Sequence, residues 1–171
     1  MSGPAVVLVG PMGVGKSTVG ALLAQWLGTT CRDTDDDVVQ AAGKPVSDIF
    51  LEDGEERFRA LEWNAVATAV RDHDGVLSLG GGAVLAPQTR ALLTGLPVVF
   101  LEMSVASAVK RVGLDAPRPL LILNPRQQWK ALMEQRRPLY TEVARAIVDT
   151  EDRTPEEVAR AVMDALELKT A

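Results

Sequence analysis

The chain has 171 residues, 47% of them hydrophobic, which predicts one compact domain. Its formal net charge of -5 argues against a general affinity for nucleic-acid backbones or anionic membrane surfaces, and its single cysteine excludes an intrachain disulfide. No apolar run approaches the ~18 residues that span a bilayer. We expect a cytoplasmic monomer whose partners are small molecules, with neither nucleic acid nor membrane among them.

A strand, a loop and a helix open the chain. Residues 5–9 form a continuous valine-rich run, typical of a strand buried on both faces of a parallel sheet. Apolar residues then recur at helical spacing from 16 to 27, and Gly28 provides a stop just beyond them.

The acidic residues 33–37 follow a second expected strand. They lead into a predicted helix that ends near Gly43, and a helix-rich stretch covers residues 46–70. A buried strand over residues 76–79 then breaks at a run of three glycines, Gly80, Gly81 and Gly82.

The second half of the chain continues this alternation. We expect helices at 87–93, 105–111 and 129–133, strands at 98–101 and 146–149, and a last helix that Thr154 and Pro155 open. Residues 113–125 carry three prolines without a steady period, which predicts a mobile loop. The whole pattern indicates a single α/β domain with an open parallel sheet of about five strands and helices on both faces.

Residues 10–17, Gly-Pro-Met-Gly-Val-Gly-Lys-Ser, match the complete pattern of a P-loop. Glycines let backbone N–H groups turn inward as an anion nest, and the following helix directs its positive end at phosphates. Lys16 can reach the β and γ oxygens, and Ser17 can ligate Mg²⁺. Chance produces this pattern in on the order of 1% of such chains, before its position after a strand is considered. We therefore predict an ATP-dependent kinase whose nucleotide contacts include Gly13, Val14, Gly15, Lys16, Ser17 and Thr18.

Two carboxylates, Asp33 and Asp35, stand where the second strand is expected to end. Alternate residues of an extended segment share a face, so both could aim at one point near the γ-phosphate. One could then serve Mg²⁺ and the other a hydroxyl group. The alternative is a solvated acidic helix start, which Asp36 and Asp37 would continue.

The run Gly80, Gly81 and Gly82 supplies free backbone N–H groups suited to the close approach of a ligand. The alternative is a plain tight turn, although three glycines are more than a turn needs. Spacing alone does not select the relevant arginines from the others in the chain.

Several of these elements occur together and in a recognisable order. They are the P-loop, the Asp33 and Asp35 pair, the Phe58-Arg59 element, the triple glycine, residues 118–120 (Arg-Pro-Leu) and residues 136–140 (Arg-Arg-Pro-Leu-Tyr). In this combination, over nearly the whole chain, the sequence resembles the shikimate kinase family. The P-loop is common to many nucleotide-binding proteins, whereas the other elements together are specific.

The resemblance implies an NMP-kinase-like P-loop kinase domain with a mobile lid. Its core would comprise about 3–32 and 74–171, its substrate-binding segment about 33–62 and its lid about 113–125. The implied reaction moves the γ-phosphate of ATP to the 3-hydroxyl of shikimate, with Mg²⁺ as cofactor, in chorismate and aromatic amino acid biosynthesis.

Site roles also follow from the resemblance. Arg59 and Arg136 would hold the shikimate carboxylate with the backbone of the triple glycine, and Asp35 would bind ring hydroxyls. Lys16, Asp35 and Arg118 would be catalytic, with Arg118 on the lid. Ser17 would bind Mg²⁺ directly and Asp33 would lie in its outer shell. Arg111 and Arg153 would bind the adenine. Which of the adjacent Arg136 and Arg137 faces the substrate is left open.

Two other functions fit the P-loop. A kinase of the same architecture acting on gluconate or a nucleoside monophosphate would not need the triple glycine together with Arg59 and Arg136. A non-catalytic ATP-binding regulator would be expected to lack acceptor residues, and here Asp33 and Asp35 are present.

Overall fold

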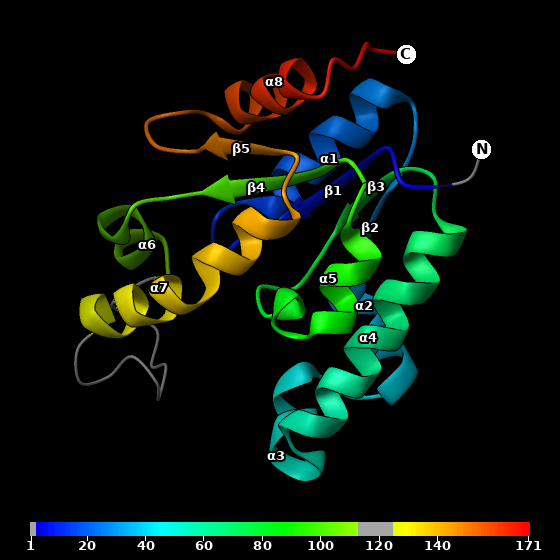
Figure 1. Cartoon of the computed structure of the whole chain (residues 1–171), viewed down its shortest axis with the longest axis vertical. Coiled ribbons are helices and arrows are strands. Elements are labelled where there is room, and N and C mark those ends of the chain that lie inside the picture. The colour runs from blue at the N-terminus through cyan, green and yellow to red at the C-terminus, as the bar shows by residue number, and fades with distance from the viewer. Residues whose placement is uncertain (1–2, 113–124) are drawn as a thin grey trace.

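The computed structural model describes residues 3–112 and 125–171, and the side chains of residues 109–126 lie outside this description. One sheet of five parallel strands, in the order β2-β3-β1-β4-β5, forms its centre (Figure 1). The strands are β1 (Val6–Val9), β2 (Cys31–Asp33), β3 (Val76–Ser78), β4 (Val98–Glu102) and β5 (Ala146–Asp149).

Helices connect these strands. They are α1 (Lys16–Leu27), α2 (Thr34–Ala42), α3 (Val46–Asp53), α4 (Glu55–Asp72), the 3₁₀ turn η1 (Ala83–Leu85), α5 (Pro87–Leu93), α6 (Val105–Val112), α7 (Pro125–Val143) and α8 (Pro155–Ala165). None of the described helices is long and apolar enough to cross a membrane.

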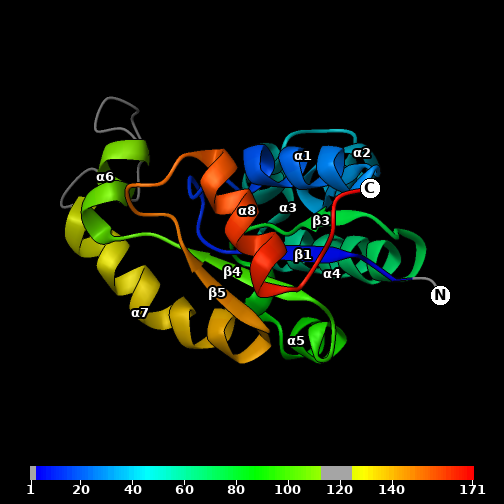
Figure 2. The ribbon, with the colours of Figure 1, turned by 90° about the horizontal axis from the view of Figure 1, so that it is seen from above.

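The sheet is buried on both faces, which explains its continuous apolar strands (Figure 2). Along β1, Val6 and Leu8 pack toward α1 and α8, whereas Val7 and Val9 pack toward α4, α5 and α7. Alternate strand residues point to opposite faces, so one strand contributes to two cores. The carboxyl ends of β1, β2 and β3 therefore meet at one edge of a rigid sheet.

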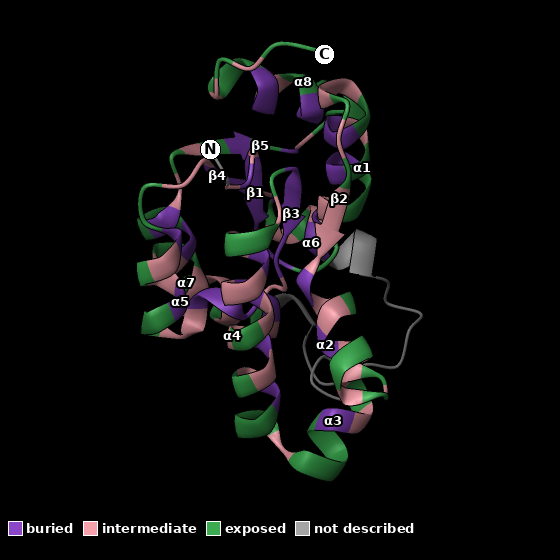
Figure 3. Ribbon diagram, turned by 90° about the vertical axis from the view of Figure 1, so that its right-hand side faces the viewer, coloured by how far each residue is buried: buried purple, intermediate pink, exposed green. Residues whose placement is uncertain are grey.

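The helices α2, α3 and α4 form a smaller unit beyond this edge. Val38, Ile49 and Phe58 make a buried cluster of their own, separate from the two cores of the sheet. Figure 3 shows α3 at the far end of this unit, with an exposed surface apart from its buried segment. This is the part of the chain for which the sequence predicts substrate binding.

The fold class is confirmed, and the helix at 16–27, the helix at 87–93 and the strand at 146–149 have the predicted bounds. Two predictions are wrong. The segment of Asp33 and Asp35 is not extended throughout, because α2 begins at Thr34, and α7 runs from Pro125 through Pro138 to Val143 rather than over 129–133 alone. The predicted lid, 113–125, lies outside the described residues except for Pro125, the first residue of α7.

Candidate active site

The P-loop joins β1 to α1 at the carboxyl edge of the sheet. Gly10 has φ 148°, and a Cβ there would lie 2.5 Å from the carbonyl oxygen of Leu101, so only glycine lets the loop leave β1 beside β4. Gly15, with φ 102°, is the N-cap of α1 and has a left-handed conformation. The loop thus presents the N-terminus of a 12-residue helix, a site suited to anions.

Lys16 folds back over this loop. Its Nζ donates to the carbonyl oxygens of Gly10 at 2.7 Å and Pro11 at 3.0 Å. Burial lowers the pKa of Lys16 from 10.5 to about 8, although Asp35 and Asp33 act in the opposite direction. Lys16 is therefore still a cation at neutral pH, held above the loop.

Asp33 and Asp35 have different local roles because a helix begins between them. Asp33 is the N-cap of α2, and its Oδ1 accepts from the backbone N–H of Asp35 at 2.8 Å. Burial raises the pKa of both carboxyl groups above 3.8, and for Asp35 the charge of Asp33 adds to the effect. Both side chains line one cavity with Lys16, so the predicted convergence occurs, but through a helix cap and not along an extended strand.

The triple glycine makes room for charged side chains. A Cβ on Gly80 would lie 2.6 Å from Oδ1 of Asp35, and a Cβ on Gly82 would lie 2.6 Å from a terminal nitrogen of Arg59. At Gly81 the corresponding distance to Arg136 is 3.6 Å. Three consecutive glycines therefore lie against the three side chains that the sequence predicts to bind the substrate.

Each of these three side chains also has a buried polar atom without a hydrogen bond, although Nε of Arg59 lies 3.6 Å from the Glu55 carboxylate. Oδ1 of Asp35, Nε of Arg59 and Nε of Arg136 are buried and have no hydrogen-bond partner in the part of the chain that the structure describes. Buried polar atoms are normally paired, and a cluster of unpaired ones calls for an explanation. A polar ligand bound at this turn would supply the missing partners.

Glu62 is a site residue that the sequence did not reveal. It is only 3% exposed, and its Oε1 accepts from Arg59 at 2.8 Å, one helical turn away on α4. Burial raises the pKa of Glu62, while the hydrogen bond from Arg59 lowers it. The only sequence signal for this pair was that Arg59 and Glu62 are three residues apart on a helix, and the same spacing of opposite charges is common on solvated helix surfaces.

The structure separates Arg136 from Arg137. Arg137 is 52% exposed at its side chain and donates from Nε to Glu102 at 2.7 Å, on the outer side of α7. Arg136 lies at Gly81 instead, and Tyr140, one turn later, donates its hydroxyl to the Gly81 carbonyl at 2.5 Å. Arg136 is therefore the arginine of this pair that reaches the glycine turn.

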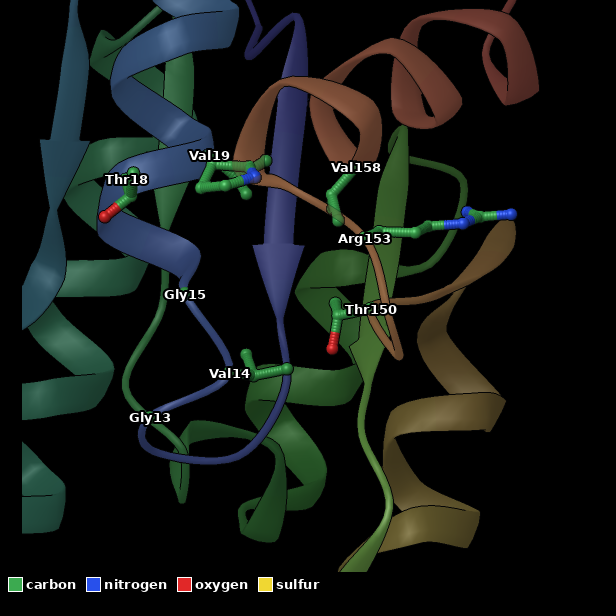
Figure 4. A pocket seen from close by; sticks show the side chains of 9 residues that line it. Gly13, Val14, Gly15, Thr18, Val19, Thr150, Arg153 and Val158 are labelled. Carbon is green, nitrogen blue, oxygen red and sulfur yellow. The ribbon is translucent and has the colours of Figure 1, made fainter. Parts of the chain in front are cut away.

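Two cavities meet at the P-loop. One, of about 340 Å³, has walls of Lys16, Ser17, the two aspartates, Gly80 and Gly81. The other, of about 320 Å³, lies between the loop and the start of α8, and its walls include Val14, Thr18, Thr150, Arg153 and Val158 (Figure 4). Both contain Gly13 and Gly15, so a molecule bound along the loop would face each cavity.

The predicted nucleotide residues are only partly described. Arg153 lines the second cavity, although its side chain extends away from the P-loop in Figure 4. The side chains of Arg111 and Arg118 lie outside the described residues. Arg59 and Arg136 are not among the residues that line the first cavity, and they stand beside its glycine wall.

Comparisons with known proteins agree with this geometry. A family model described as shikimate kinase matches residues 12–167. The shikimate kinase of Streptomyces avermitilis is 66% identical over 171 residues, which cover 100% of both chains. A solved structure of the shikimate kinase from Acinetobacter baumannii in complex with shikimate has a TM-score of 0.87 and 33% identity, over 98% of this chain and 94% of that one.

A gluconokinase from Sinorhizobium meliloti is a more distant structural match. Its TM-score is 0.56 at 18% identity, over 96% of this chain and 91% of that one, so it shares the fold alone. The family match, the curated relative and the shikimate-bound structure all point away from that alternative. The chain belongs to the shikimate kinase family and is an ATP-dependent kinase, as its motifs predicted.

Proposed function

We propose that this chain transfers the γ-phosphoryl group of ATP to the 3-hydroxyl of shikimate, giving shikimate 3-phosphate and ADP, a step toward chorismate and the aromatic amino acids. The observation that carries the proposal is the close approach of Asp35, Arg59 and Arg136 to the consecutive glycines of one turn beside the P-loop. One carboxylate and two guanidinium groups match a ligand that has hydroxyl groups and a carboxylate.

The acceptor would be held by complementary charge. Arginine presents a planar fork that suits a carboxylate, which favours Arg59 and Arg136 as partners of the shikimate carboxylate. Glu62 holds the Arg59 guanidinium through its hydrogen bond. Asp35, in the cavity that also contains Lys16, would accept from a ring hydroxyl and orient it toward the nucleotide.

The protein mainly positions the reactants and neutralises charge. Phosphoryl transfer passes through a loose transition state with charge on the equatorial oxygens, and donors fixed in advance stabilise that charge. Lys16 supplies one such donor from within the loop. We assign a second to Arg118, and the adenine to the cavity at Arg153 together with Arg111, by the resemblance of their motifs.

Ser17 and Asp33 fit Mg²⁺ that arrives with the nucleotide. Both line the cavity at the P-loop and offer oxygen, the ligand type that Mg²⁺ prefers. Among the described residues no group of three or more acidic, histidine or cysteine side chains could hold a metal alone. Such a site suits an ion that keeps waters and phosphate oxygens as further ligands. The bound Mg²⁺ would neutralise charge at the phosphates.

We further propose that the enzyme acts as a cytoplasmic monomer. Its P-loop, glycine turn and arginines all come from one chain. Light scattering of the purified protein should give a mass close to the chain's 18.3 kDa, and a concentration-independent dimer would contradict this.

Release of ADP tests the function. Purified protein with ATP and Mg²⁺ should release ADP rapidly with shikimate, and only at background rate with gluconate, a nucleoside monophosphate or no acceptor. Preference for another acceptor would overturn the assignment. Binding of ATP without turnover of any acceptor would instead indicate the non-catalytic alternative.

A further inference from the structure

Tyr140 occupies an unusual position between the core and the glycine turn. It is the chain's single tyrosine, it is fully buried in α7, and its ring lies 4.9 Å from that of Phe100 on β4. The ring is therefore fixed by the core beneath the sheet. A buried tyrosine needs a partner for its hydroxyl group, and here that partner belongs to the candidate site.

The hydroxyl lies between two site residues. It donates to the Gly81 carbonyl at 2.5 Å, and the Arg136 guanidinium is near enough to lower the pKa of the hydroxyl. A phenol has one donor and can accept as well, so it can serve both residues at once. Arg136 and Tyr140 lie four residues apart on α7 and share a face, which makes their contact local and stiff. Arg136, Tyr140 and Gly81 thus meet at the Tyr140 hydroxyl.

This arrangement orients two sets of donors. The Arg136 guanidinium lies beside the Tyr140 hydroxyl, and its Nε is buried without a hydrogen-bond partner among the described residues. The Gly81 carbonyl is turned toward Tyr140, and in a trans peptide the N–H of Gly82 then points the opposite way. Burial raises the pKa of Tyr140 above 10.0, so its hydroxyl keeps the proton that it donates.

We propose that Tyr140 is a positioning residue for substrate recognition, which aims the Arg136 guanidinium and the Gly81–Gly82 peptide at the carboxylate of the acceptor. This inference rests on the proposed function for the identity of the acceptor. Tyr140 acts through Arg136 and the glycine turn and does not touch the substrate.

The variant Tyr140→Phe keeps the ring against Phe100 and removes the hydroxyl alone. We expect the KM for shikimate to rise about tenfold, the range of one hydrogen bond, with the KM for ATP and kcat changed much less. Val143→Ala is the matched control, because it loosens the same helix in the same core without touching the hydroxyl. It should lower the melting temperature and leave the KM for shikimate unchanged.

A double-mutant cycle separates positioning from simple support of the fold. In an Arg136→Ala background, Tyr140→Phe should cost clearly less shikimate affinity than in the unaltered protein, because only the Gly81–Gly82 peptide is left for Tyr140 to aim. Additive losses in the cycle, or equal rises of the KM values for ATP and shikimate in Tyr140→Phe, would overturn the inference. Absence of shikimate turnover in the unaltered protein would sink the proposed function instead, so the two failures are distinguishable.

Discussion

Asp35, which lies against Gly80 of the glycine turn, can be tested by removing its charge alone. The variant Asp35→Asn keeps the size of the side chain and removes its charge. We expect kcat to fall about 10²–10⁴-fold, the usual effect of losing a group that orients or accepts a proton, with an unchanged far-UV spectrum. Asp36→Asn is the control, since Asp36 is the exposed neighbour on α2. Near-normal turnover of Asp35→Asn would refute the role of this carboxylate.

Gly82→Ala should displace Arg59 without unfolding the protein. The added Cβ would lie 2.6–2.7 Å from the two terminal nitrogens of Arg59, the flexible end of a long side chain that can move aside. We expect the KM for shikimate to rise, with little change in the melting temperature. Gly81→Ala offers the comparison, because its nearest contact is an ordinary 3.5 Å. Equal effects of the two substitutions on the KM for shikimate would contradict this steric account.

Glu62 links pH to stability. Burial raises the pKa of Glu62 above 4.5, and this is the largest effect. The hydrogen bond and charge of Arg59 lower the pKa, the charge of Asp35 raises it, and the charge of Arg136 lowers it. The folded protein then holds a proton that the unfolded chain has released, so ionisation of Glu62 reduces the free energy of unfolding as pH rises from 4.5 through the folded pKa. Glu62→Gln removes this dependence.

Urea denaturation from about pH 4 to about pH 7 checks the sign. The free energy of unfolding of the unaltered protein, minus that of Glu62→Gln, should decrease as pH rises. Glu55→Gln is the control, because Glu55 approaches the same Arg59 at 3.6 Å from a side chain that is 65% exposed, where solvent screens the charge. A difference that grows with pH would mean that the ion pair outweighs the burial of Glu62.

The sequence could predict Asp35 from its position after the second strand, but it could predict Arg59 and Arg136 only through family motifs. It could not predict the neighbours of these residues. Glu62 lies on a helix with many exposed polar residues, and nothing in its local pattern distinguishes a buried carboxylate from a solvated one. Arg136 and Arg137 are identical in type, and only the position of Glu102 on β4 shows which is turned outward. Such choices depend on contacts between residues far apart in the chain.

At the scale of elements, helix ends position the site. The start of α2 could have been predicted, because an aspartate at the N-cap followed by acidic residues in the first turn favours a helix. The length of α7 could not, because proline normally interrupts a helix. Here Pro138 lies within α7, and the buried Tyr140 and Val143 after it pack that part of the helix against the sheet.

The start of α8 allows a test at this scale. Thr154 and Glu157 form a capping box, with the Glu157 N–H donating to Thr154 Oγ1 at 3.1 Å, and the flanking Arg153 and Pro155 line the second cavity. Thr154→Ala should lower the free energy of unfolding by about 1 kcal/mol and raise the KM for ATP, not that for shikimate. Thr154→Ser, which keeps the hydroxyl, should leave both the free energy of unfolding and the KM for ATP close to those of the unaltered protein. A rise confined to the KM for shikimate would contradict the assignment of this cavity to the nucleotide.

At the scale of the whole molecule, the parallel sheet explains why distant residues meet. Because β2, β3 and β1 are adjacent and parallel, their carboxyl ends bring Asp33, Gly80 and the P-loop to one edge. A crevice at this edge is the general ligand site of open α/β sheets. The alternation of strands and helices was enough to predict this architecture, but not which side chains fill the crevice.

A structure of the protein with shikimate and ADP bound tests the central claim most directly. The account predicts the shikimate carboxylate on Arg59 and Arg136 beside the glycine turn, with Asp35 on a ring hydroxyl that faces the P-loop. Shikimate bound elsewhere, or bound at the turn without contact to these three side chains, would contradict it.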